Sequence, residues 1–175
     1  MTVLADWGFA DELVVQRLQN LLHGSTRLTT ALAAVDAEFN ALWGADLCTP
    51  PPASISSWEL DRALSAGTAQ VYVYTSERRE EDKRYSEQPI AVITAHVDVV
   101  LQARDVGTTS AYLRRYACAV FRLLLGNRGL DPDNDGLRGV VGIGIPRAAQ
   151  AFSHVNRRGA LLITLPDVMV QEYGN

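Results

Sequence analysis

An alternating acidic run, Asp131, Asp133, Asp135 and then Gly136, has the spacing of the first half of a calcium-binding loop. Alternate carboxylates can converge on one hard cation, and the glycine permits a sharp turn. The position at which such a loop carries its bidentate glutamate is Gly142 here, and the residues from 138 onward read as a strand. We therefore expect a polar turn between a helix and a strand, with a cation at Asp131 to Asp135 as an open alternative.

The glycine pair Gly142 and Gly144 lies in the run Val-Val-Gly-Ile-Gly-Ile-Pro. A dinucleotide fingerprint needs a third glycine and places its glycines after a strand, whereas these fall within one. We expect the pair to permit close approach of a helix or a neighbouring backbone. No cofactor is expected.

The three histidines, His23, His96 and His154, are scattered, and none has the spacing of a zinc ligand pair. His96 and Asp98 share one strand face, so a hydrogen-bonded pair on the sheet surface is expected. The sequence holds no nucleophile elbow, phosphate loop or Cys-x-x-Cys. We assign no catalytic and no metal-binding residue, and we do not expect an enzyme.

The composition is that of an ordinary globular domain. The chain has 175 residues, of which 47% are hydrophobic and 21% charged, enough to bury one core. We expect a single domain over residues 1–175. The net charge of -4 gives no general attraction to nucleic acid or anionic lipid. With no signal peptide and no membrane-spanning stretch apparent, we expect the protein to stay in the cytoplasm where it is made, or to enter a particle there.

Helical periodicity marks four segments, 9–23, 26–42, 57–66 and 110–126, the last capped by Thr109 or Ser110. Three successive prolines after the second segment predict a stiff extended connector.

Four strands are expected, at 69–76, 89–103, 138–146 and 160–171. In the second, apolar residues alternate with a mixed set that includes Thr94 and His96, which indicates a sheet with one packed and one partly wet face. Pro166 marks an edge position or a bend in the last strand. The fold class that follows is α+β: a four-stranded, mostly antiparallel sheet with a long hairpin, packed by the N-terminal and central helices.

The charged run at 77–88 joins the first two strands and is expected to form the tip of the hairpin. Two interpretations stand side by side. The run is a solvated tip that keeps strand ends from aggregating, or it is an arm that docks on a partner through charge pairs around an aromatic anchor. The partner-binding residues in the second interpretation are Arg78, Arg79, Glu80, Glu81, Asp82, Lys83, Arg84 and Tyr85.

This arrangement over about 9–173 resembles the tail terminator and tail completion proteins of tailed bacteriophages, and their relatives in contractile injection systems. The features that carry the resemblance are the opening helix, the strand Val71 to Thr75, the charged tip, the long strand Ile90 to Ala103, the helix Ser110 to Leu125 and the closing strand pair. The segment 26–42 and the prolines read as an insertion or variation on that pattern.

The resemblance implies a homo-oligomeric ring, usually a hexamer, located in the neck of a virion assembled in the bacterial cytoplasm. Its partners would be the tail tube protein and the head–tail connector or adaptor, and DNA would pass through the lumen without specific binding. A head–tail adaptor or head completion protein is the nearest alternative. A small-molecule-binding module or enzyme, with a pocket lined by His96, Asp98 and the loop 131–136, is the alternative of another class.

Overall fold

The computed structural model describes residues 9–23, 27–57, 67–81, 90–131, 139–153 and 157–171. Three helices and six strands lie within them. The helices are α1 (Phe9–His23), α2 (Arg27–Trp43) and α3 (Val106–Gly126). The strands are β1 (Pro52–Ser56), β2 (Ala69–Glu81), β3 (Ile90–Gln102), β4 (Val140–Ile143), β5 (Arg147–Ser153) and β6 (Arg158–Gln171). The α+β class is confirmed.

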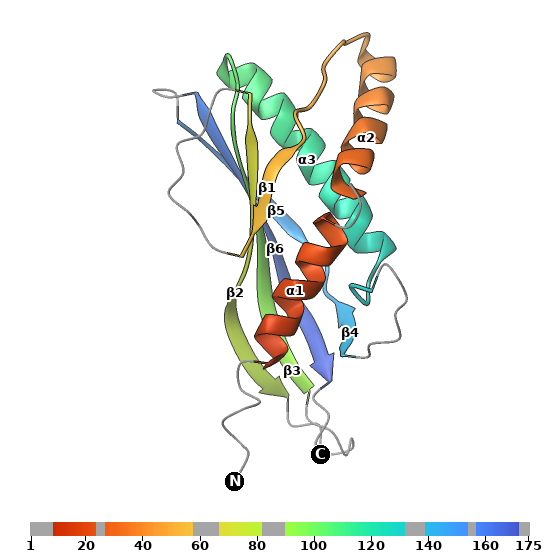
Figure 1. Cartoon of the computed structure of the whole chain (residues 1–175), viewed down its shortest axis with the longest axis vertical. Coiled ribbons are helices and arrows are strands. Elements are labelled where there is room, and N and C mark those ends of the chain that lie inside the picture. Colours follow the sequence, from red (N-terminus) through yellow and green to blue (C-terminus); the bar gives the residue numbers. More distant parts are fainter. Residues whose placement is uncertain are drawn as a thin grey trace.

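The sheet runs in the order β1-β2-β3-β6, and β4 and β5 both pair with the outer side of β6 (Figure 1). β1 is parallel to β2, and every other pairing is antiparallel. The described sheet is thus mixed and six-stranded, where four mostly antiparallel strands were expected.

Two strands were missed for different reasons. β1 was expected to be part of an extended connector, but the residues after the prolines pair with β2, and Pro52 is tolerated because it opens an edge strand. β5 has no alternation of apolar and polar residues, because its side chains are exposed on both faces.

The hairpin of β2 and β3 is longer than expected. Its ladder continues to the pair Glu81 and Ile90, with an irregularity between Thr75 and Glu77. The expected end of the strand at Ser76 was therefore wrong, because β3 supplies backbone partners to the charged residues as well. The rest of the charged run, 82–88, lies outside the described residues.

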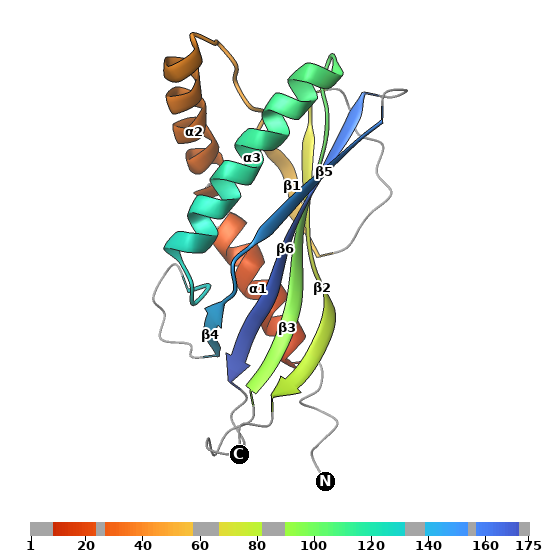
Figure 2. The same ribbon diagram turned by 180° about the vertical axis from the view of Figure 1, so that it is seen from behind.

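One face of the sheet is buried, and we call it the dry face. In β3 the odd-numbered residues from Ile93 to Leu101 are fully buried, and Thr94, His96 and Asp98 on the other face are partly exposed, so the predicted alternation is confirmed. α1 and α3 cover the dry face, and α2 packs on them as an outer layer (Figures 1 and 2). We call the other side of the sheet the open face.

The helix boundaries match the sequence except at the start of α3. The cap is Asp105, whose carboxylate accepts a hydrogen bond from the Thr108 backbone at 2.7 Å, not Thr109 or Ser110. Thr109 is buried one turn into the helix. The expected short helix at 57–66 lies almost wholly outside the described residues. No described helix is long and apolar enough to cross a membrane.

Pro166 lies at an irregularity of β6, where the ladder with β3 shifts register between the pairs Leu165–Ala95 and Val168–Ile93. It lies between the stretch of β6 that pairs with β5, ending at Thr164, and the stretch that pairs with β4, starting at Val168. Its missing donor is harmless there. The expected close approach at the glycine pair is confirmed: a Cβ at Gly144 would lie 3.1 Å from Cβ of Asp167 on β6.

Candidate functional site

The first two residues of the predicted arm point to opposite faces of β2. Arg78 is largely buried on the helix side, with Nη1 3.6 Å from Oδ2 of Asp11 in α1. Arg79 lies on the open face and donates to Oδ1 of Asp167 at 2.7 Å. Both guanidinium groups therefore have partners within the chain, and both residues belong to the paired strand β2 rather than to the loop at its end.

Of the other predicted arm residues, two lie in β2 and four lie outside the described residues. Glu80 and Glu81 belong to the last pairs of the β2–β3 ladder. Asp82, Lys83, Arg84 and Tyr85 lie outside the described residues. A partner-binding role for this segment stays a prediction.

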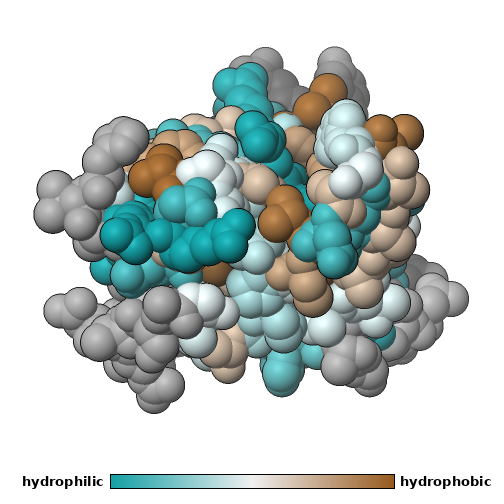
Figure 3. Space-filling view, turned by 90° about the horizontal axis from the view of Figure 1, so that it is seen from above, coloured by the Kyte–Doolittle hydropathy of each residue, from teal (hydrophilic) through white to brown (hydrophobic). Residues whose placement is uncertain are grey.

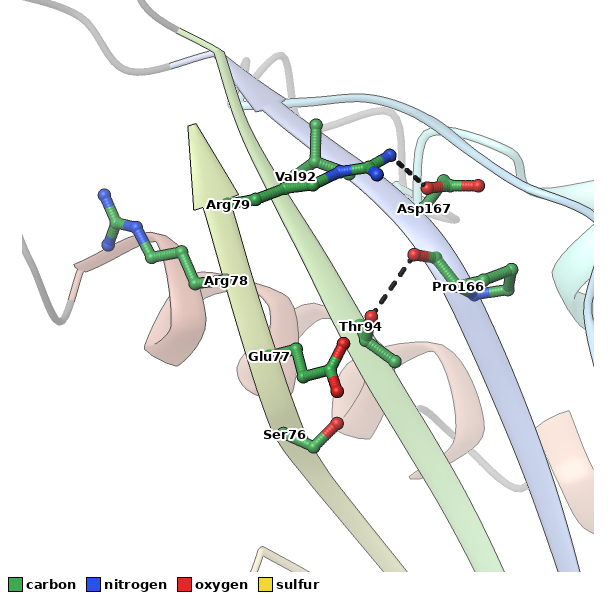
Figure 4. Close-up of a pocket in the computed structure, with 8 residues that line it drawn as sticks. All are labelled: Ser76, Glu77, Arg78, Arg79, Val92, Thr94, Pro166 and Asp167. Carbon is green, nitrogen blue, oxygen red and sulfur yellow. Dashed lines mark hydrogen bonds and ion pairs between the residues drawn. The ribbon is translucent and has the colours of Figure 1, made fainter. Parts of the chain in front are cut away.

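A cavity of about 630 Å³ opens on this part of the sheet, lined by residues of β2, β3 and β6. Figure 4 shows Arg79 reaching over Val92 to Asp167, Thr94 turned toward the carbonyl oxygen of Pro166, and Arg78 pointing away. The walls hold both charge signs already paired across the strands. Among the described residues, no group of three His, Cys, Asp or Glu side chains could hold a metal ion.

His96 lies on the open face beside this cavity. Its Nε2 lies 2.7 Å from Oγ of Ser76, its Nδ1 lies 3.3 Å from Oγ1 of Thr164, and its ring stacks on Tyr74 at 4.9 Å. Asp98 accepts a hydrogen bond from the Tyr74 hydroxyl at 3.1 Å. The expected hydrogen bond between His96 and Asp98 was therefore wrong, because hydroxyl groups on the neighbouring strands take both histidine nitrogens.

This arrangement is ill suited to nucleophilic catalysis. A serine on a histidine nitrogen is the start of a catalytic triad, but the carboxylate that would orient the imidazole bonds to a tyrosine here. Burial lowers the pKa of His96, and the charges of Asp98 and Glu77 oppose that shift.

The described residues do not form the pocket that was the alternative prediction, lined by His96, Asp98 and the loop 131–136. Asp131 lies near α1, where its Oδ1 is 3.2 Å from Nη1 of the buried Arg17. Residues 132–136 lie outside the described part of the chain.

The largest feature that the sequence did not reveal is the outer edge of the sheet. Six of the seven residues of β5 are exposed. Among the described strands, β5 pairs only with β6, so its outer backbone groups face away from the sheet. The only sequence signal for this edge is a run of small residues with no alternation, Ala148, Ala149 and Ala151 around Gln150.

Exposed apolar side chains also occur elsewhere, most strongly at the end of α2 and near β4. Leu42 and Trp43 at the end of α2 are 71% and 68% exposed, and Val141 and Ile145 near β4 are 58% and 80% exposed. Seen from above in Figure 3, hydrophobic residues form separate patches among hydrophilic ones.

The comparison with solved structures finds a likeness. No protein-family model and no curated protein matches the chain. Among solved structures, a chain described as "Virion of native gene transfer agent (GTA) particle" is similar, with 18% sequence identity and a TM-score of 0.42. The match covers 83% of this chain and 92% of that chain.

Proposed function

We propose that the chain is a structural assembly protein of a phage-like particle, one copy of a ring that ends the tail tube and joins it to the head connector. The observation that carries the proposal is the edge of the sheet along β5, which no other strand of the described residues covers. Its partners would be further copies of itself, the tail tube protein and the connector.

An open edge is a backbone surface that invites another chain. Its N–H and C=O groups can extend a ladder into a neighbouring molecule. Soluble proteins usually guard such an edge with lysine, proline or a covering element. β5 has Arg147 at its first position and then alanines and a glutamine up to Phe152. A strand edge whose backbone groups are this accessible suits a protein that is permanently bound to other subunits.

The rest of the described surface supports assembly rather than a pocket reaction. In the open-face cavity Arg79 already pairs with Asp167, and His96 beside it has hydroxyl partners on both nitrogens. The net charge of -4 also fits a ring lumen through which DNA must slide without being held.

The test blocks the edge without touching the core. Lysines replace Ala149 and Ala151, both exposed and paired to β6. Particles from producing cells are then examined by electron microscopy. We expect the purified variant to fold with an unchanged Tm, and the cells to accumulate heads and tails that are not joined.

The matched control places the same two lysines on α2, at the exposed Ala33 and Ala34. The control should yield complete particles. Normal joining with the β5 variant would contradict the proposal, and unjoined heads that already carry the protein would indicate an adaptor on the head side instead.

A further inference from the structure

We infer that neighbouring copies in the ring meet through two unlike surfaces, the end of α2 on one copy and a basic corner on the next. The end of α2 consists of Leu42, Trp43 and Asp46. The basic corner consists of Arg104, Phe152 and Arg157. This inference rests on the proposed ring.

The end of α2 presents a rigid apolar tip. Leu42 and Trp43 are the most exposed large apolar side chains on any described helix. The Trp43 ring packs edge-on against Phe39 at 4.7 Å. Gly44 ends the helix in the left-handed region with φ 60°. Tryptophan in a fixed position is a common anchor of protein interfaces, because little entropy is lost when it is buried.

This tip is also negative. Asp46 is exposed just after the helix, and the carbonyl end of a helix carries partial negative charge. The stretch 28–57 contains no lysine or arginine at all. Glu38, one turn earlier, is held by Arg122 of α3 through two hydrogen bonds.

The basic corner is where β3 ends, α3 begins and β5 turns into β6. Arg104 has an 84% exposed side chain, and Arg157 is exposed and donates to the Arg104 carbonyl oxygen at 2.8 Å. Asp105 is the acidic residue beside them and caps α3. Arg104 contacts the Asp105 carboxylate at 3.2 Å, so among the described residues of the corner the charge of Arg157 and the helix N-terminus leave it positive.

An apolar side chain lies in this positive surface. Phe152 is 36% exposed, and its ring approaches Gly159 on the side where α3 packs. The corner is rigid, because the Thr109 hydroxyl contacts the backbone of Ala103 and of Arg157 at 3.2 and 3.1 Å. An apolar residue at a positive corner of the molecule is the complement of the α2 tip.

The two surfaces lie where a ring needs them. Figures 1 and 2 both show the end of α2 and the paired ends of β5 and β6 (the last residues of β5 and the first of β6) at the same end of the molecule, on opposite flanks. Copies joined through unlike faces at one level stand side by side. Such heterologous contacts generate closed rings when the rotation between copies closes.

The test uses the exposed Cys48, which follows the α2 tip in the chain. In a Cys118→Ser background, Ser153→Cys adds a thiol next to Phe152. Assembled particles are treated with a short bismaleimide and denatured. We expect a ladder of dimer, trimer and higher species, because each copy then carries one thiol on each unlike face. Dimers alone would indicate a symmetric contact and overturn the inference.

The matched control is Ser57→Cys in the same background, since Ser57 is equally part-exposed but lies beside α1. It should give no ladder, and an equal ladder would overturn the inference. A second test is charge exchange. Asp46→Arg should weaken self-association of the purified chain about tenfold, and Arg157→Asp on the same chain should restore it. Failure to restore it would also count against the contact.

The outcomes separate this inference from the proposed function. Particles that need the protein but give no ladder would leave the assembly role standing and remove this contact. If a ladder forms but particles assemble without the protein, the contact between copies would stand and the proposed assembly role would be removed.

Discussion

Two polar networks of this molecule use similar groups in opposite surroundings. One lies between α2 and α3, where Arg115 donates to Asp36, to Asn40 and to the Leu47 carbonyl at 2.5–3.0 Å. The other lies on the open face, where Arg79 and Asp167 meet at 2.7 Å. The Arg115 and Asp36 side chains are 3% and 12% exposed, whereas those of Arg79 and Asp167 are 65% and 49% exposed.

From this comparison we expect that burial, not distance, decides what each ion pair contributes to stability. Out of water, a charge left without its partner is strongly destabilising, and in water it is simply solvated. The buried network therefore holds the connector after α2 in place, through Asp36 to Thr49 at 2.7 Å and through Arg115 to Leu47. The open-face network adds little to stability and leaves that surface adaptable.

The largest effect is expected from Arg115→Met. Asp36 would remain buried without its cation, which should lower the free energy of unfolding by about 3–5 kcal/mol. Urea denaturation followed by circular dichroism measures it. Adding Asp36→Leu should recover part of the loss, but not all, because Thr49 also loses its acceptor. A loss below about 1 kcal/mol for Arg115→Met would show that the network is dispensable.

A matched pair of tyrosines gives the next effect. The Tyr116 hydroxyl donates to the Pro50 carbonyl at 2.7 Å inside the α2–α3 corner, and burial raises its pKa. Tyr116→Phe should cost about 1–2 kcal/mol, because that carbonyl loses its donor. Tyr74→Phe on the open face should cost under about 0.5 kcal/mol, since water replaces the hydroxyl. Equal losses in urea denaturation would contradict the comparison.

Arg79→Ala should change the free energy of unfolding by less than about 1 kcal/mol, because the ion pair with Asp167 is exposed. Added salt should change the wild type slightly and the variant less. Thermal unfolding at low and high ionic strength checks this. A loss as large as that of Arg115→Met would show that burial is not the deciding factor.

The smallest effect is a pH dependence from His96. Its folded-state pKa lies below the ordinary value of 6.5, so the unfolded chain binds the proton more readily. Stability is fully present above pH 6.5 and falls as the pH drops toward the folded-state pKa. His96→Gln should lose less stability than the wild type between pH 7.5 and about 5.5 in thermal unfolding. Parallel curves would show that His96 is not involved.

Sequence patterns determined the helices and the dry face of the sheet. Periodicity located α1 and α2 to within a residue, and alternation identified the buried side of β3, because burial selects apolar residues at the period of each element. The absence of spaced catalytic and metal-binding motifs was also readable directly from the residues.

The tertiary structure decided the rest. β1 and β5 have no apolar period, so they became strands only because β2 and β6 supplied backbone partners. The continuation of β2 through charged residues depended in the same way on β3. The partners of His96, Arg78 and Arg115 come from distant segments, and no local pattern encodes them. Hydrogen bonding between strands and long-range ion pairs depend on how the chain is brought together, which spacing along the sequence does not report.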